Sequence, residues 1–488
     1  MMFFKKKTNT APGKIRLRFP PSPTGPVHIG TMRTMLFNYL FAKQHGGEIV
    51  LRIEDTDKER SKLEWVQNII DELHWLGITW NEGPDIGGKF GPYKQSQRSD
   101  IYKKYLKKLL AENTAYYCDC SAEELEAKRQ DQQSRGLAPK YDGKCRNLHK
   151  TSGVIRFKIH ERKVKFHDLV RGDVEFDMAL LGDIVIAKDL ETPLYHFAVV
   201  VDDFEMKISH IIRGEDHLSN TPKQILLQEA FGFYQPEYAH IPLLLNPNKS
   251  KMSKRAGDVA VSDYHNNGYL PEAVVNFMAL LGWNPGTEKE IFSLQELVKE
   301  FSLERVQKAG AVFNVQRLDF INATYIRKKT PAQLVQLSGP YIPETAKNMP
   351  PKTLEKIMAT CQSRMKKLSD VTELADYLFA DTLQYDKNLL KWKEMQDNDV
   401  KEALLLCDKT AQGMGKWNAK ELEKKFIAVA EEFNTAKGYP VQNKGYVLWP
   451  LRVALSGKQA SAGPFEIADI LGKEKTLQRI HNALDKLG

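Results

Sequence analysis

Long apolar segments are absent from this chain of 488 residues. No apolar run approaches the roughly 18 residues that a membrane span requires, so we expect no membrane partner. The opening "MMFFKKKTNTAPGK" has lysines after a brief apolar start but lacks the apolar stretch of a secretory signal. Cysteine is scarce, with 5 residues, which argues against a disulfide scaffold and favours a reducing compartment. These absences predict a cytoplasmic protein.

A strong charge imbalance is also missing. Lysine and arginine number 71 against 62 aspartate and glutamate residues, a formal net charge of +9. This small excess fits ordinary solvation as well as an anionic partner, and charge alone does not decide between them. The chain is too long for one hydrophobic core, so we expect roughly three or more domains.

The apolar pattern changes along the chain. Up to about residue 260, short β-branched runs alternate with helical stretches, which is typical of an α/β domain: "GEIVLRI", "GVIRFKI", "DIVIAKD" and "MKISHIIRG". Beyond about residue 325 the segments have helical periodicity and are rich in lysine, as in "AKELEKKFIAVAEEFNTAKG". The pattern predicts an N-terminal half with a sheet and an all-helical C-terminal half.

The stretch "PPSPTGPVHIG" (20–30) stands between a strand pattern and a helix pattern. Before it, Ile15, Leu17 and Phe19 alternate with basic residues, which predicts a strand with one buried face. After it comes the stripe of an amphipathic helix, formed by Met32, Met35, Leu36, Tyr39 and Leu40. A turn from strand to helix in an α/β sheet can bind phosphate at the helix N-terminus. The alternative is an ordinary proline-rich loop with a satisfied surface histidine.

A second basic stretch is "NKSKMSKRAGD" (248–258), in which Lys249, Lys251, Lys254 and Arg255 alternate with serine and lead into glycine. Such a loop could neutralise the charge of a polyphosphate. The alternative is a solvated basic loop.

Ordered motifs along almost the whole chain resemble those of one family. They are "PSPTGPVHIGT", "RIEDTD" (52–57), "YHFAVVVDDFEM" (195–206), "IIRGEDHLSNTP" (211–222) and "KMSKR" (251–255), with further similarity in "YLPEAVVNFMALLGW" (269–283) and "WPLRVALSG" (449–457). Together they resemble the bacterial-type glutamyl-tRNA synthetases, which are class I aminoacyl-tRNA synthetases. The resemblance implies that ATP, as its Mg²⁺ complex, activates L-glutamate, which is then transferred to the 3′ end of tRNA(Glu).

The resemblance assigns the ATP site to the two signature motifs. His28 would hydrogen-bond phosphate in the transition state, and Gly30 would leave space for the nucleotide. Lys254 would clamp the triphosphate, helped by Lys251 and Arg255. Cations and helix N-termini suit this task, because attack on the α-phosphorus of ATP brings two anions together.

Glutamate has one ammonium and two carboxylates, so its pocket should offer a carboxylate and guanidinium groups. The family pattern places Arg18 and Arg213 on the substrate carboxylates and Glu54 on the ammonium, with Ser22 and Tyr195 completing the pocket. Each has a structural alternative: an outward Arg18, a Glu54 that pairs with Arg52, or a Tyr195 in the core. At Val199 some relatives have a polar residue that touches substrate, so that contact is not expected here.

Three cysteines form a C-x-C-x24-C pattern, Cys118, Cys120 and Cys145. It resembles the structural zinc site of some family members, in which a metal holds a long insertion with little core of its own. At the family's histidine position this chain has Asn147, so we expect Tyr141 as the fourth ligand of one Zn²⁺, with His149 as the alternative. Three reduced surface cysteines would be the non-functional interpretation.

The resemblance implies a modular monomer with a Rossmann-like catalytic domain. Its expected parts are a first catalytic segment, an inserted zinc-containing subdomain that binds the tRNA acceptor end, a second catalytic segment with KMSKR, a helical linking domain and an α-helical anticodon-binding domain, over residues 14–115, 116–205, 206–260, 261–325 and 326–488. Two rivals remain. A glutaminyl-tRNA synthetase reads the anticodon with β-barrels, and a non-catalytic tRNA-binding paralogue would lose the signature motifs.

Anticodon discrimination is expected from the helical part. The anticodons for glutamate and glutamine differ at the third base, C against G, and relatives that reject tRNA(Gln) read that cytosine with an arginine on a helix. The segment "TCQSRMKKLSD" (360–370) aligns so that Arg364 takes this position. Arginine suits the task because its rigid donors fit the acceptors of an unstacked cytosine. The alternative is an arginine that binds phosphate or is merely solvated.

Overall fold

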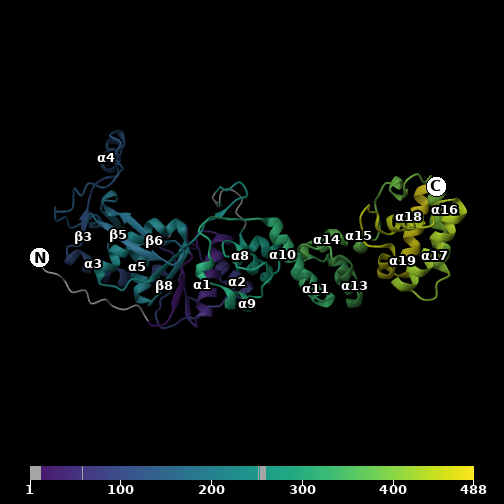
Figure 1. Cartoon of the computed structure of the whole chain (residues 1–488), viewed down its shortest axis with the longest axis horizontal. Coiled ribbons are helices and arrows are strands. Elements are labelled where there is room, and N and C mark those ends of the chain that lie inside the picture. The colour runs from purple at the N-terminus through teal and green to yellow at the C-terminus, as the bar shows by residue number, and fades with distance from the viewer. Residues whose placement is uncertain (1–12, 58, 251, 253–259) are drawn as a thin grey trace. The chain divides into compact units, whose positions relative to one another are not determined.

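The computed structural model describes residues 13–57, 59–250, 252 and 260–488. The chain divides into two compact units. The first runs through Asn266 and resumes over Pro271–Ile321, and the second comprises Asn267–Leu270 and Asn322–Gly488. Figure 1 labels many of the elements of both units.

Parallel strands form the centre of the first unit. β1 (Arg16–Phe19) pairs with β2 (Glu48–Leu51), and α1 (Ile29–Gln44) connects them. β8 (His210–Gly214) pairs in the same sense with β9 (Glu237–Ile241), and α6 (Thr221–Phe231) connects these two. The backbone N–H of Ser209, just before β8, donates to the carbonyl of Arg16 at 2.9 Å. This β–α–β arrangement confirms the Rossmann-like fold that the sequence predicts.

β1 differs from the prediction of a half-buried strand, because all four of its residues are buried. Strands of parallel sheets are covered on both faces, so alternation does not identify an exposed side. The arginines of β1 are buried in ion pairs: Arg16 contacts Glu48 and Glu82, and Arg18 contacts Asp203. The basic residues of this alternating pattern are therefore buried in ion pairs rather than exposed to solvent.

The helix after the proline-rich turn begins where the sequence predicts. The predicted stripe of α1 is buried, and so are Arg33, Phe37, Asn38 and Phe41 outside it. Burial on most sides makes α1 an interior helix rather than an amphipathic surface helix. This unit also contains α2 (Leu63–Trp75), α3 (Ser99–Ala111) and α5 (Tyr195–Glu205) before the basic loop.

Antiparallel strands dominate the segment between β3 and α5. β3 (Ala115–Cys118), β4 (Val154–Phe157) and β7 (Ile184–Ala187) form one sheet, and the helix α4 (Ala122–Ser134) follows β3. β5 (Lys163–Asp168) and β6 (Gly172–Asp177) form a hairpin. β5 also pairs with β9, where Asp168 lies opposite Tyr238. One end of this segment is thereby part of the sheet of β8 and β9.

The remainder of the first unit is largely helical. β10 (Leu244–Leu245) pairs with β11 (Ala311–Val312). The other elements are α7 (Val261–Asn266), α8 (Pro271–Leu280), α9 (Leu294–Glu300) and α10 (Val315–Arg327), the last of which extends into the second unit.

The second unit, which the structure describes in full, contains helices and no strands (Figure 1). This confirms the all-α C-terminal region. Its longer helices are α13 (Pro351–Cys361), α16 (Asp397–Gln412), α17 (Ala419–Lys437), α18 (Gly445–Ser456) and α19 (Pro464–Leu487), the last interrupted at Gly472. Its shorter helices are α11 (Pro331–Leu337), α12 (Glu344–Lys347), α14 (Val371–Leu374) and α15 (Asp376–Phe379). A search of the described residues of both units finds no helix with the length and hydropathy of a membrane span.

Candidate functional site

A cavity of about 570 Å³ opens at the carboxyl ends of β1 and β8. This is the edge at which ligands bind in open α/β sheets. The cavity wall contains every described residue that the sequence analysis assigns to ATP or glutamate: Arg18, Ser22, His28, Gly30, Glu54, Tyr195 and Arg213. Residues from four separate stretches of sequence therefore meet in one place.

Two buried arginines of the cavity each keep one nitrogen without a partner. The side chain of Arg18 is 1% exposed, and its Nε donates to Asp203 Oδ1 at 3.2 Å. Arg213 donates through Nε to His240 Nε2 at 3.1 Å and through Nη2 to Thr221 Oγ1 at 2.8 Å. The Nη1 atoms of Arg18 and Arg213 are buried and have no hydrogen-bond partner among the described residues. Buried donors without acceptors are costly, so this pair indicates an anionic ligand.

Glu54 faces the same cavity and is held by Arg52. Arg52 Nη2 donates to Glu54 Oε1 at 2.9 Å, while Arg52 Nη1 donates to Asp203 Oδ1 at 2.7 Å. The structural pairing of Glu54 with Arg52 is thus present together with its place in the cavity wall. Burial raises the pKa of the Glu54 carboxyl, and the charge of Arg52 opposes that rise.

His28 is the N-cap of α1. Its Nδ1 accepts hydrogen bonds from the backbone N–H of Gly30 at 3.2 Å and of Thr31 at 3.3 Å, and its Nε2 lies 3.0 Å from Thr31 Oγ1. A Cβ on residue 30 would lie 3.2 Å from two atoms of the His28 ring. The absence of a side chain at Gly30 therefore accommodates the capping imidazole, a reason that the sequence analysis did not foresee.

Further histidines line the cavity beside Tyr195. The Tyr195 hydroxyl lies 3.1 Å from His217 Nδ1. Burial lowers the pKa of His217 and of His196 to about 4, so both rings are neutral at physiological pH. Neither histidine was predicted as a site residue, although both lie in the motifs quoted above. Val199 is buried and lies outside the cavity wall.

The basic loop falls largely outside the described residues. Lys251, Lys254 and Arg255 belong to that part of the chain, so their roles stay predictions. Met252, from the same motif, is described. Its backbone N–H donates to the Leu244 carbonyl at 3.1 Å, and it lines the cavity.

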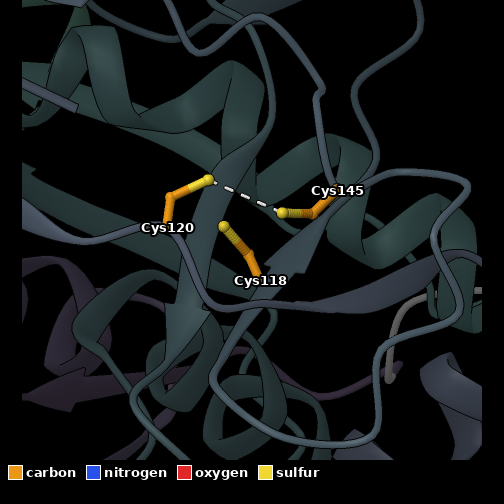
Figure 2. A group of neighbouring side chains, drawn as sticks. All are labelled: Cys118, Cys120 and Cys145. Carbon is orange, nitrogen blue, oxygen red and sulfur yellow. Dashed lines mark hydrogen bonds between the residues drawn. The ribbon is translucent and has the colours of Figure 1, made fainter. Parts of the chain in front are cut away.

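The three cysteines lie together at the end of β3 (Figure 2). Their sulfur atoms are all within 4.8 Å of one another, and Cys120 Sγ is 3.5 Å from Cys145 Sγ. The Tyr141 hydroxyl lies 3.4 Å from Cys118 Sγ and 3.7 Å from Cys120 Sγ. Since Cys118 and Cys145 are buried, these are not surface cysteines. The cluster could hold a metal ion.

The alternative fourth ligand does not belong to this cluster. His149 is exposed and is not among the grouped ligand atoms of the described residues, whereas the Tyr141 hydroxyl contacts two sulfur atoms and accepts from the backbone N–H of Cys145 at 3.0 Å. The geometry favours Tyr141 over His149.

Comparison with protein families gives two matches. Residues 14–320 match the catalytic domain of the class I tRNA synthetases for E and Q, and residues 333–484 match an anticodon-binding domain. The chain belongs to the class I tRNA synthetases.

Individual relatives place this synthetase among the glutamate–tRNA ligases. It is 43% identical to glutamate–tRNA ligase 1 of Caldicellulosiruptor saccharolyticus, over 96% of this chain and 98% of that protein. It is 42% identical to the glutamate–tRNA ligase of Carboxydothermus hydrogenoformans, over 96% and 99% of the two chains. A crystal structure of a glutamate tRNA ligase from Elizabethkingia meningosepticum, in complex with its amino acid, superposes with a TM-score of 0.87 at 33% identity and covers 97% of the synthetase and 100% of that chain.

These findings confirm the family that the sequence motifs indicate. The helical second unit and the named relatives reject the glutaminyl alternative, whose anticodon region would contain β-barrels. Arg364 lies differently from the expectation of a helical position: α13 ends at Cys361, and Arg364 is exposed in the turn that follows. Its role stays a prediction.

Proposed function

We propose that this synthetase joins L-glutamate to the 3′ end of tRNA(Glu), with ATP activating the amino acid. The observation that carries the proposal is the pair of buried arginines, Arg18 and Arg213. Each leaves Nη1 without a partner among the described residues, in a cavity that Glu54 also lines. Two guanidinium donors and one carboxylate match the two carboxylates and one ammonium of glutamate.

The charge balance of the pocket supports glutamate over glutamine. The charged side chains of the cavity wall are three guanidinium groups (Arg18, Arg33 and Arg213) and two carboxylates (Glu54 and Asp216), which leaves one positive charge in excess. Glutamate carries one net negative charge, whereas glutamine is neutral. Because an uncompensated charge in a buried site is costly, glutamine would leave the pocket unbalanced.

The first step is attack of the glutamate α-carboxylate oxygen on the α-phosphorus of ATP. The new oxygen–phosphorus bond forms as the bond to pyrophosphate breaks, giving glutamyl-adenylate. Since His28 Nδ1 accepts from backbone N–H groups, a neutral ring carries its proton on Nε2. In the structure this N–H lies 3.0 Å from Thr31 Oγ1, and we assign it to a phosphate oxygen when ATP is bound. We assign Lys254, with Lys251 and Arg255, to the triphosphate. Mg²⁺ enters with ATP as part of the substrate.

In the second step, a hydroxyl of the terminal tRNA ribose attacks the glutamyl carbonyl carbon. The ester bond forms, AMP leaves with the electron pair of the acyl–phosphate bond, and the hydroxyl proton is released. We assign the acceptor end to the inserted segment 116–205 and the anticodon to residues 326–488. Residues 14–115 and 206–260 make up the catalytic domain, and 261–325 the linking domain.

The cysteine cluster fits one structural Zn²⁺. Cys118, Cys120 and Cys145 would supply three thiolates and Tyr141 the fourth ligand, in agreement with the preference of Zn²⁺ for four ligands rich in sulfur. The ion would cross-link β3 to the loop that contains Tyr141 and Cys145, two stretches that meet in a small buried cluster of Tyr116, Cys118 and Cys145. We assign it no part in the chemical steps.

Charging assays with the full-length protein test the proposed function. We expect labelled glutamate, and not labelled glutamine, to become attached to tRNA(Glu), with a strict requirement for ATP. The assays include tRNA(Gln), which we expect the enzyme to charge poorly. Attachment of glutamine to either tRNA in preference to glutamate would contradict the proposal.

A further inference from the structure

Three neighbouring strands carry a line of buried polar side chains behind Arg213. Asp168 ends β5, His240 lies in β9, and Arg213 lies in β8. The register pairs Arg213 with His240 across β8 and β9, and it places Asp168 opposite Tyr238, two residues before His240. Asp168 and His240 are 0% exposed and Arg213 is 4% exposed. The line thus crosses the sheet from the inserted segment to the cavity wall.

The hydrogen bonds along this line determine one protonation state for His240. Asp168 Oδ2 lies 2.6 Å from His240 Nδ1, and since a carboxylate accepts, Nδ1 carries the proton. Arg213 has only donors, and its Nε lies 3.1 Å from His240 Nε2, so Nε2 is unprotonated and accepts. Thr221 Oγ1 also lies 3.1 Å from Nε2, and its hydroxyl can donate to the same lone pair. His240 is therefore neutral, and Asp168 selects its tautomer.

Both ends of the line are anchored by further hydrogen bonds. Asp168 Oδ1 accepts from the backbone N–H groups of Val170, Arg171 and His240. Although burial raises the pKa of Asp168, the hydrogen bonds from His240 and the backbone outweigh burial and hold it below its usual range. At the other end, Arg213 Nη2 donates to Thr221 Oγ1. The guanidinium plane of Arg213 is thus fixed at two of its three nitrogens.

We propose that His240 is a positioning residue for Arg213 and that Asp168 acts through it by selecting the Nδ1–H tautomer. With Nε and Nη2 held, the remaining nitrogen Nη1 is presented to a carboxylate of the substrate. This inference rests on the proposed function, because it concerns the side chain that would bind glutamate. It gives the inserted segment a part in amino-acid binding, since that segment supplies Asp168.

The substitution Asp168→Asn tests the tautomer directly. An amide N–H facing His240 Nδ1 would favour the opposite tautomer, and the Nε2–H would then oppose the N–H of Arg213 Nε. We expect the KM for glutamate to rise about 10-fold, which corresponds to one misplaced charge-assisted hydrogen bond, with kcat and the KM for ATP nearly unchanged. The measurement is charging of tRNA(Glu) at saturating ATP.

The same substitution in a His240→Gln background separates positioning from structure. Glutamine has no tautomers, so we expect Asp168→Asn to leave the glutamate KM of that background unchanged. If Asp168 only supports the backbone at Val170 and Arg171, its substitution will raise the KM equally in both backgrounds. Such an equal rise, or no rise in either background, would overturn the inference.

A second pair of variants decides the question if Asp168→Asn does not fold. Glutamine at position 240 can still accept from Arg213 Nε, whereas leucine cannot, so we expect a glutamate KM at least about 5-fold lower for His240→Gln than for His240→Leu. Equal KM values for the two variants would overturn the inference.

A matched control comes from the same strand. Tyr238→Phe removes a buried hydrogen bond with Gln228 but keeps the ring, and we expect its glutamate KM to stay within about 2-fold of the unsubstituted enzyme. A larger rise would show that general disturbance of β9 is enough to weaken glutamate binding. If the unsubstituted enzyme did not charge glutamate at all, the proposed function would fail instead.

Discussion

The two compact units differ in the charge that they bury. The first contains many buried charged side chains: Arg16, Arg18, Arg33, Arg52, Glu54, Glu72, Glu82, Arg98, Arg156, Asp168, Asp183, Asp202, Asp203 and Arg213. In the second unit, which is described in full, Arg479 is the single buried charged residue. Buried charge is costly unless it is paired, so its concentration in one unit indicates a use beyond stability.

The local surroundings show what that use is. In the first unit, Arg18 and Arg213 at the cavity have a carboxylate and a histidine partner, respectively, and each leaves Nη1 without a partner among the described residues. In the second unit, Arg479 donates to the backbone carbonyls of Leu455, Tyr377 and Ala380 and thereby ties together three stretches of chain. Buried arginines join backbone in both units, as Arg33 does through the carbonyls of Leu281 and Pro242. Only in the first unit do two of them, Arg18 and Arg213, leave Nη1 without a described partner in the wall of a cavity.

The largest expected effect comes from a matched pair of substitutions. Arg213→Met should lower kcat/KM for glutamate about 10²–10³-fold, because it removes charge-assisted hydrogen bonds to the substrate. Arg479→Met should lower the Tm while the kcat/KM for glutamate stays close to that of the unsubstituted enzyme. Charging kinetics and thermal unfolding measure the two effects. If Arg479→Met lowered kcat/KM for glutamate as much as Arg213→Met does, the contrast between the two units would be wrong.

Lys254, which lies outside the described residues, tests whether cations of the first unit act on ATP. Lys254→Ala should lower glutamate activation by about 10²-fold or more, as loss of one transition-state donor does, with tRNA affinity nearly unchanged. The measurement is ATP–pyrophosphate exchange in the presence of tRNA. Lys249→Gln, in the same stretch of sequence, is the control and should retain activity. Full turnover by Lys254→Ala would remove Lys254 from its assigned role.

The cysteines extend the comparison to metal binding. Three of them cluster in the first unit, whereas Cys361 and Cys407 in the second are buried and outside that cluster. Cys120→Ser should release one zinc and impair tRNA charging more than folding of the ATP site, while Cys407→Ala should retain the zinc. Metal analysis of protein purified without chelator measures both. Absence of zinc from the unsubstituted protein would refute the assignment.

Arg364 tests whether an exposed arginine of the second unit reads a base. Arg364→Gln should narrow the preference for tRNA(Glu) over tRNA(Gln) by roughly 1–3 kcal/mol, the value of one base contact. Lys366→Gln, also exposed, is the control. If Arg364 binds phosphate, its substitution will weaken both tRNAs equally and flatten the salt dependence. Equal charging of both tRNAs by the unsubstituted enzyme would show that Arg364 does not exclude tRNA(Gln).

The smallest expected effect concerns a buried carboxyl of the first unit that has no arginine partner among the residues that the structure describes. Burial raises the pKa of Glu72 from its ordinary 4.5 to about 7, and His265 Nδ1 lies 3.6 Å from its Oε2. The folded chain therefore binds this proton more tightly than the unfolded chain does, so the free energy of unfolding falls as pH rises from about 4.5 to about 7.

Glu72→Gln should remove that dependence. We expect the variant to be more stable than the unsubstituted enzyme at pH 8, by on the order of 1–2 kcal/mol, and similar to it at pH 4. Denaturant unfolding at both pH values measures this, and Glu64→Gln, an exposed position of the same helix, is the control. A gain of the same size at both pH values would contradict the raised pKa.

Particular residues show how much of the structure could be predicted from the sequence. The proline-rich turn, the strands around it and the helices beyond residue 325 follow from local periodicity, and all of them are present. The members of the cavity wall came from ordered motifs. The burial of Arg16 and Arg18 was not predictable from alternation, because an arginine between apolar residues usually marks an exposed face. Arg364 was expected on a helix, but α13 ends three residues before it.

The sequence by itself determined the residue types of the site, the backbone turns that carry them and the helical character of the second half. Only the tertiary structure decided which charges are partners. Asp168 and His240 stand 72 positions apart and His240 and Arg213 stand 27 apart, and pairing of β5, β9 and β8 brings them together. The physical reason is that propensity and periodicity act over a few residues, whereas the choice of a neighbouring strand depends on the packing of the whole unit.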